Sequence, residues 1–497
     1  MTIRTRRTSN NSAKQLIKHI GWVLILLWLS TMLWQTHKPL ADGMHVNSAP
    51  VMLAESATHF LTDLTYQSSQ DRRVAEQHIF DAVLKQVDEA QHFIVLDYFL
   101  VNDGMGASGK ALRSISRELA DHLLARKRAA PTLQVLLITD PINDVYGGAS
   151  SALFAELRQA GIAVVSTDLT KLRDSNPGYS AIWRGLAQWF GNSEQGGWLP
   201  NPFDSAADNI TLRSWLSLMN FKANHRKVVI SDRADGEWVA LIASANPHDA
   251  SSAHSNVAVQ FSGELVKAVF DSELAIARFS GWTGAIAMPE RRATTTGMGN
   301  VELSYVTEGA ILEHLLREID QTKPGDQIHL AMFYLSERSV IDALKLAASR
   351  DVAIRIILDP NKDAFGIKKD GVPNRPVANE LIEQGHGNIE VRWYRTHGEQ
   401  FHTKLLLVQR YEQLFATLGS ANFTRRNLDD YNLEANVAIT MPVNSELATQ
   451  MQGYFNRLWN GDALTTEYTA PFGVYKDDSA VRYWRYRLME ATGLSTF

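Results

Sequence analysis

The same succession of helical and strand-like segments occurs twice in this chain of 497 residues. In each copy an apolar pattern with the helical period precedes a strand-like segment, and a second apolar run of strand length follows further on. The paired segments are 77–90 with 311–319, 93–100 with 328–335, and 133–140 with 352–359. Strands that alternate with helices, twice over, predict two α/β units.

Each copy also carries a His-x-Lys triplet in front of an apolar run that suits a buried strand. The triplets contain His225 with Lys227 and His402 with Lys404. Residues two apart in a strand face the same side, so each histidine should point with its lysine. A Ser-x-Asn triplet follows at intervals that suit a returning hairpin, namely Ser244 with Asn246 and Ser420 with Asn422.

The pattern HxK(x)4D followed by GSxN resembles the phospholipase D superfamily, and the resemblance covers residues 55–497. It implies two pseudo-twofold-related repeats, each a mixed β-sheet flanked by helices. It also implies a covalent phosphohistidine intermediate that water or an alcohol later captures. By this analogy His225 is the nucleophile and His402 the general acid. Among members of the superfamily, the chain resembles cardiolipin synthases and other phosphatidyltransferases.

The chemistry of these residue types agrees with the resemblance. Imidazole titrates near neutral pH, so two histidines can share the roles of nucleophile and acid and exchange them in the second half-reaction. Lys227 and Lys404 can stabilise charge on the phosphate oxygens. The two Ser-x-Asn triplets can donate hydrogen bonds to those oxygens. No metal or other cofactor is required, and no cluster of histidines and acids has better ligand spacing.

The two motifs are not identical. Asp232 ends the first motif, whereas Gln409 stands at the equivalent position of the second, and Ala243 replaces the first glycine of GSxN. The motif aspartate falls on the opposite face of its strand, which predicts a role in supporting the hairpin. Activity is expected to be retained, although a one-sided pseudoenzyme is an open alternative.

A catalytic histidine needs an acceptor that sets its tautomer. Glu434, 12 residues after Asn422, is the predicted carboxylate for His402. The comparable stretch of the first copy offers Asn256 and no acid. Asp97 is a weaker candidate for the first histidine, and a capped or paired acid at a strand end is the preferred interpretation of it.

The N-terminus has the features of a membrane signal. Residues 1–19 carry five basic side chains and no acid, and the uncharged stretch 20–36 follows, with Trp22 and Trp34 near its ends. A helix of that length spans about 26 Å, near the lower limit for a bilayer. We predict a basic cytoplasmic tail and a single-pass signal-anchor, the other interpretation being a cleaved signal peptide. The body then lies in the periplasm, outside the inner membrane of a bacterial cell.

The remaining boundaries follow from the repeat. Repeat 1 is predicted over 55–287, a linker over 288–300 and repeat 2 over 301–497. Repeat 1 contains a Trp-rich insert, 179–220, which forms either an added core or lid, or a surface that meets lipid. A monomer with an internal pseudo-dimer is expected.

Composition limits the function classes. The absence of cysteine excludes disulfides, Cys-ligated zinc, iron–sulfur clusters and thiol nucleophiles. The net charge is −5, and without the five basic residues of the tail it is −10, which disfavours a nucleic-acid substrate. The leading hypothesis is a membrane-anchored phospholipase D or phosphatidyltransferase that acts on a phospholipid, with water, an alcohol or a second phospholipid as acceptor. A nuclease and a binding protein with degenerate sites are the alternatives.

Overall fold

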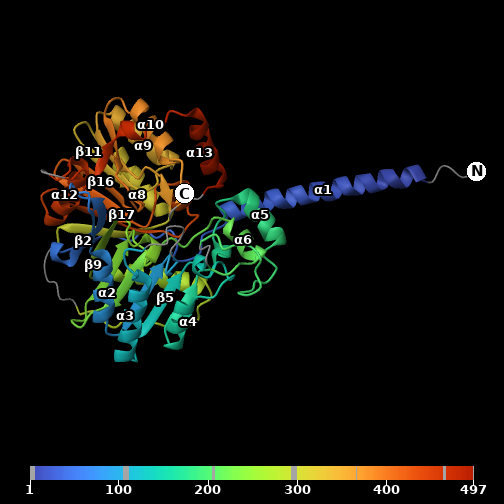
Figure 1. The fold of residues 1–497 in the computed structure, drawn as a ribbon, viewed down its shortest axis with the longest axis horizontal. Coiled ribbons are helices and arrows are strands. Elements are labelled where there is room, and N and C mark those ends of the chain that lie inside the picture. Colours follow the sequence, from blue (N-terminus) through green and yellow to red (C-terminus); the bar gives the residue numbers. More distant parts are fainter. Residues whose placement is uncertain are drawn as a thin grey trace, which may run out of the picture.

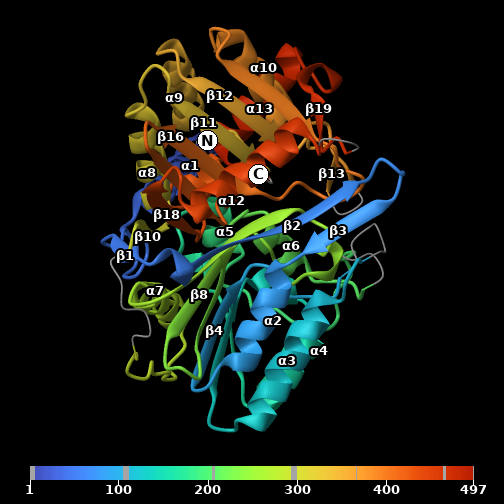
Figure 2. The same ribbon diagram turned by 90° about the vertical axis from the view of Figure 1, so that its left-hand side faces the viewer.

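Two mixed β-sheets with helices on their outer faces form the body of the protein (Figures 1 and 2). The computed structural model describes residues 6–104, 111–203, 207–292, 299–364, 367–462, 466–495 and 497. The predicted α/β class is confirmed. The predicted linker 288–300 lies partly outside the described residues, since 293–298 are not among them.

The first sheet has the strand order β3-β2-β9-β8-β7-β4-β5-β6. Only β4 with β5 and β5 with β6 are parallel. The strands are β2 Thr58–Gln67, β3 Arg73–Gln77, β4 Phe93–Tyr98, β5 Gln134–Thr139, β6 Ala163–Ser166, β7 Lys227–Asp232, β8 Trp238–Ala243 and β9 Asn256–Ser262. Strands β4 and β7 are buried along their whole length, which explains their almost uninterrupted apolar sequence.

The second sheet has the order β1-β10-β18-β17-β16-β11-β12-β15-β19. Its strands are β1 Val51–Leu53, β10 Val301–Thr307, β11 Gln327–Met332, β12 Ala353–Leu358, β15 Ile389–Tyr394, β16 Lys404–Arg410, β17 Gln413–Gly419, β18 Ala435–Pro442 and β19 Thr469–Pro471; β13 Asp363–Ala364 and β14 Ile367–Lys368 pair separately. The seven strands from β10 to β15 in this sheet are arranged in the same order as their equivalents from β2 to β6 in the first sheet. Strand β1 precedes the first repeat in sequence yet pairs with β10, so the chain links the two units at its start.

Helices cover the outer faces of both sheets (Figure 2). They are α2 Ile79–Glu89, α3 Ile115–Ala129, α4 Ala152–Gln159, α8 Gly309–Asp320, α9 Arg338–Ser349, α10 Asn374–Gln384 and α13 Ala480–Thr492. Helices α7 Val266–Phe279 and α12 Glu446–Asn460 lie on the inner faces and pack in the core between the sheets. The short helix α11 Arg425–Leu428 packs beside α8. Helices α2 and α8 bury the apolar faces that the repeated pattern indicates.

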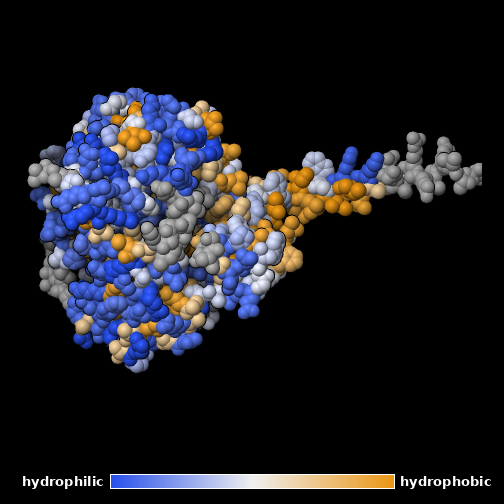
Figure 3. Space-filling view, in the orientation of Figure 1, coloured by the Kyte–Doolittle hydropathy of each residue, from blue (hydrophilic) through white to orange (hydrophobic). Residues whose placement is uncertain are grey.

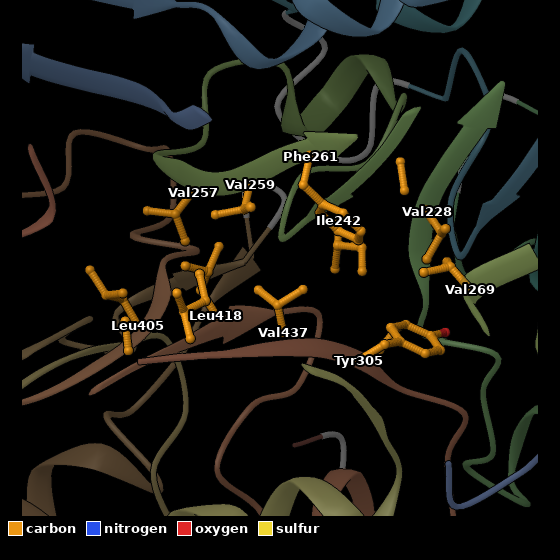
Figure 4. Close-up of a cluster of buried hydrophobic side chains, with 14 of the residues drawn as sticks. Val228, Ile242, Val257, Val259, Phe261, Val269, Tyr305, Leu405, Leu418 and Val437 are labelled. Atoms are coloured by element: carbon orange, nitrogen blue, oxygen red, sulfur yellow. The ribbon is translucent and has the colours of Figure 1, made fainter. Parts of the chain in front are cut away.

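The two units share one apolar core, which lies between the sheets (Figure 4). The first unit contributes Val257, Val259 and Ile242, and the second contributes Leu405, Leu418 and Val437. All six side chains are fully buried. Because burying one such side chain contributes about 1.5–3 kcal/mol, this core holds the units together as one body.

Helix α1, Arg6–His37, projects from the body beside α5, Pro177–Leu186, and α6, Leu212–Leu218 (Figure 1). Within it, Ala13–His37 is long and apolar enough to cross a membrane. Helices α5 and α6 belong to the Trp-rich insert. Of the insert's tryptophans, Trp183 is buried, whereas Trp189 and Trp198 are exposed.

Candidate active site

The two His-x-Lys motifs enter equivalent strands, β7 and β16, by reciprocal contacts with the other unit. Asn224 forms an isolated parallel bridge with Leu433, and Phe401 forms one with Ser255. The backbone N–H of His225 donates to the carbonyl oxygen of Leu433 at 2.8 Å. The segment before each His-x-Lys motif therefore lies beside a segment of the opposite unit. That segment precedes β18 in the second unit and β9 in the first unit.

Charge coupling indicates that both motifs lie in one site. Burial is the main reason why the pKa of His402 lies well below its usual value. Electrostatic repulsion from Lys404, His254 and Lys227 lowers it further. Lys227 belongs to the other motif, so the two motifs are close enough to interact electrostatically.

His225 is bound by a carboxylate from the second unit. Its Nδ1 lies 2.9 Å from Oε1 and 3.0 Å from Oε2 of Glu434, the residue before β18. The spacing in the sequence predicts that Glu434 serves His402, and that prediction is wrong. The β17–β18 connection crosses to the opposite motif, because β18 packs at the interface between the units.

His402 is bound by an amide instead. Its Nδ1 lies 3.0 Å from Oδ1 of Asn256, the first residue of β9. The Nδ2 of Asn256 donates to the carbonyl oxygen of His254, which leaves Oδ1 to accept from the imidazole. The two histidines thus occupy equivalent positions, but among the residues that the structure describes only His225 has an anionic hydrogen-bond partner.

The serines of both Ser-x-Asn triplets are used to hold these partners. Ser244 Oγ donates to Asn256 Oδ1 at 3.0 Å, and Ser420 Oγ donates to Glu434. Each hydroxyl also accepts a backbone N–H. This differs from the expectation that the serines bind phosphate, since both are fully buried and already engaged.

The protonation states are set by burial. Burial lowers the pKa of His225 to about 4, although Glu434 opposes the shift. For Glu434 burial alone would raise the pKa, but His225 and Lys227 lower it overall. A neutral imidazole that donates Nδ1–H to an anionic carboxylate keeps its Nε2 lone pair available, which is the state required of a nucleophile.

Two buried lysines provide positive charge. Burial lowers the pKa of Lys227 to about 7 and that of Lys404 well below its usual value, the latter also through repulsion from Lys227. Each ammonium lies 5.3 Å from a phenylalanine ring centroid, Phe99 in the first unit and Phe333 in the second.

These phenylalanines also contact the histidines, with ring centroids 5.0 Å apart for Phe99 and His225, and 5.1 Å apart for Phe333 and His402. The sequence motifs predict no role for these two phenylalanines. A signal was present, since each stands one residue after an equivalent buried strand.

The asparagines of the two Ser-x-Asn triplets differ in their hydrogen bonds. Asn246 Oδ1 accepts the backbone N–H of Leu100 at 3.3 Å. The buried Oδ1 of Asn422 has no hydrogen-bond partner in the part of the chain that the structure describes. Asn422 therefore keeps hydrogen-bonding capacity for a bound group.

The remaining acids are structural. Asp232 accepts the backbone N–H groups of residues 91–93. It lies seven residues, or about 23 Å of extended strand, from His225. At the equivalent position of the second motif, Gln409 accepts a hydrogen bond from Gln452 at 2.8 Å. Asp97 accepts from Asn224 Nδ2 with both carboxylate oxygens, at 2.8 and 2.9 Å. The alternative that Asp97 is the carboxylate for His225 is therefore wrong, because Glu434 occupies that position.

No group of three or more His, Asp or Glu side chains that could hold a metal ion occurs among the described residues. A pocket of about 210 Å³ lies between the insert and the ends of the first sheet. Its lining includes Trp183, Phe190, Arg213 and Lys222, and neither histidine belongs to it.

Residues 315–459 match the family model described as "Cardiolipin synthase, PLD-like domain". This chain contains a PLD-like domain. For residues 315–459 the resemblance to the phospholipase D superfamily is thereby confirmed. A search of curated proteins finds no match.

The similarity of fold to a solved structure extends beyond residues 315–459. Phosphatidylserine synthase from Haemophilus influenzae Rd KW20 matches with a TM-score of 0.55 at 10% identity, over 89% of this chain and 97% of its own. At that identity the match concerns the fold alone. Polyphosphate kinase from Porphyromonas gingivalis matches more weakly, with a TM-score of 0.45 at 14% identity, over 92% of this chain and 56% of its own.

Proposed function

We propose that this protein is a membrane-anchored enzyme of the phospholipase D type that cleaves a phospholipid phosphodiester and transfers the phosphatidyl group to water or an alcohol. The observation that carries the proposal is the unequal pair of histidine partners, Glu434 for His225 and Asn256 for His402. The match of residues 315–459 to a cardiolipin synthase domain supports a phospholipid as the substrate.

In the first step Nε2 of His225 attacks phosphorus, so that a P–N bond forms as the P–O bond to the leaving alcohol breaks. The leaving oxygen takes a proton from Nε2 of His402. Glu434 stabilises the positive charge that develops on His225. Lys227 and Lys404 stabilise the non-bridging oxygens.

His402 must carry a proton for this step, although burial and the lysines disfavour it. A bound phosphodiester brings a negative charge beside both lysines, and this raises the affinity of His402 for a proton. In the second step His402 removes a proton from water or an alcohol, whose oxygen attacks phosphorus and displaces His225. Protons and bonds are then restored to their initial state.

We further propose that α1 anchors the chain in the inner membrane of a bacterial cell, with the body in the periplasm. The five basic residues before the apolar stretch favour retention of the N-terminus in the cytoplasm. Because one chain supplies both motifs, a monomer suffices for activity. Protease digestion of the body in spheroplasts, but not in intact cells, is the expected result.

The test of the activity is incubation of the full-length protein with phosphatidylglycerol and phosphatidylethanolamine vesicles, with and without an added alcohol. Mass spectrometry distinguishes phosphatidic acid, the product of hydrolysis, from a phosphatidyl alcohol, the product of transfer. His225→Ala should abolish both products. Absence of lipid turnover together with digestion of single-stranded DNA would identify a nuclease instead, and lipid binding without turnover would identify a degenerate binding protein.

A further inference from the structure

The insert between β6 and β7 exposes large apolar side chains on the side of the body from which α1 projects (Figure 1). Trp189 is 77% exposed and Leu186 is 67% exposed. We call the following residues the apolar face: Ile182, Leu186, Trp189, Phe190 and Trp198. In Figure 3 apolar atoms extend along α1 to its junction with the body. An exposed cluster of this kind is unusual for a surface that faces only water.

Helix α5 carries its only charge inward. Arg184 is buried and pairs with Asp174 through two hydrogen bonds of 2.8 and 2.9 Å. The outward side of α5, which carries Ile182 and Leu186, therefore presents no charged group. Such a surface can enter lipid without burying an unpaired charge.

Helix α1 is held firmly against the insert and its flanking loop. Trp28 Nε1 donates to the carbonyl oxygen of Gly178, in the first turn of α5, at 3.0 Å. The backbone N–H of Asp174 donates to the carbonyl oxygen of Gln35 at 3.0 Å, and Arg173 Nε donates to that of Lys38 at 2.9 Å. These contacts set the level of the insert along the axis of α1.

That level lies inside the apolar stretch of α1. Trp28 precedes Thr36 by eight residues, or about 12 Å of helix. If the bilayer ended where α5 meets Trp28, only residues 20–27 would remain to cross it. Those residues extend about 12 Å, far less than the ~30 Å of a hydrocarbon core. A membrane-spanning α1 therefore requires lipid at the level of α5.

The C-terminal helix adds a second apolar ridge on the same side of the body (Figure 1). Val481, Trp484 and Leu488 lie at helical spacing along α13 and are all exposed. This spacing directs the three side chains to one face of the helix.

We propose that the apolar face of the insert is immersed in the lipid bilayer, in the leaflet that adjoins the body. This inference rests on the proposed membrane anchor and extends it, because it places lipid against the insert as well as around α1. The insert leads directly into β7, with Asn220 only five residues before His225. Immersion of the insert therefore holds the first histidine motif close to the lipid surface.

The absence of cysteine allows single labels without background. We would introduce Leu186→Cys in the apolar face, Leu24→Cys in the anchor and Leu346→Cys as a matched control. Leu346 is also an exposed leucine on a helix, but it lies on α9, away from α1 (Figure 1). Each full-length variant is labelled with an environment-sensitive fluorophore and reconstituted in phosphatidylethanolamine–phosphatidylglycerol vesicles that contain nitroxide-labelled lipid.

The expected result is quenching by the nitroxide lipid at positions 24 and 186 that is several-fold stronger than at position 346. Quenching at 24 with position 186 no different from 346 would overturn the apolar-face proposal and leave the anchor intact. Quenching at neither 24 nor 186 would overturn both.

A second measurement requires no label. Brominated lipid should quench the tryptophan fluorescence of the unlabelled chain, and Trp189→Phe should reduce that quenching. Equal quenching of the two proteins would contradict the proposal.

Discussion

Glu434→Gln tests the mechanism most directly because it removes charge while keeping the shape of the side chain. The carboxylate is fully buried and accepts from His225 Nδ1, Ser420 Oγ and Asn427 Nδ2. All three partners donate, so the NH₂ group of glutamine must face a donor. The variant also loses the negative charge that stabilises a cationic His225.

The expected magnitude follows from the bond that is lost. A hydrogen bond to a charged group contributes about 1.5–3 kcal/mol. Since ~1.36 kcal/mol corresponds to a tenfold change in rate, kcat/KM should fall by roughly 10- to 150-fold. The burst of leaving alcohol in rapid-quench experiments should slow by the same factor, because the first step is the one affected.

The matched control is Asn256→Asp, the isosteric change in the opposite direction at the equivalent position. It gives His402 an anionic partner, which should raise the pKa of His402 and move the alkaline limb of the pH profile to higher pH. Circular dichroism verifies that both variants are folded. A kcat/KM for Glu434→Gln within about threefold of wild type, less than ~1 kcal/mol, would refute the assigned role of Glu434.

Three further outcomes are expected. Burial lowers the pKa of His225 to about 4, so this nucleophile stays neutral as the pH falls below 6.5. The acid limb of the pH profile of kcat/KM should therefore lie well below pH 6.5. An acid limb near pH 6.5 would contradict the assignment of His225 as the nucleophile. Arg226→Met removes the partner of the buried carboxylates of Glu273 and Glu308, and it should lower the free energy of unfolding in denaturant titration by about 3–5 kcal/mol. The control is Arg233→Met, whose ion pair with Asp235 is partly exposed, and it should lower that free energy by less than ~1 kcal/mol. Gln409→Asp should leave kcat unchanged, and a large gain in rate would show that the second motif is impaired as it stands.

The architecture could be predicted from the sequence because its signals are local. The apolar period of α2 and α8 and the buried runs of β4 and β11 each extend over fewer than fifteen residues. Their recurrence in the same order indicates two similar sheets. The His-x-Lys spacing is a local signal as well, since residues i and i+2 of one extended strand lie on the same face.

The partners of the two histidines could not be predicted in this way. Glu434 lies close to Asn422 in sequence, which favoured His402, yet it binds His225 at a separation of 209 residues. Asn256 lies in the first unit and binds His402. Both contacts cross the interface, and their assignment depends on which segments the packing of the sheets brings together.

The amino-acid sequence by itself determined the repeated α/β pattern, the two motifs and the apolar N-terminal stretch, because each depends on spacing along a short segment. Only the tertiary structure decided which histidine receives the carboxylate and where the insert sits relative to α1. The physical reason is that hydrogen bonds between distant segments, and the burial of their side chains, depend on how the helices and strands pack. The spacing of residues along the chain does not determine that packing.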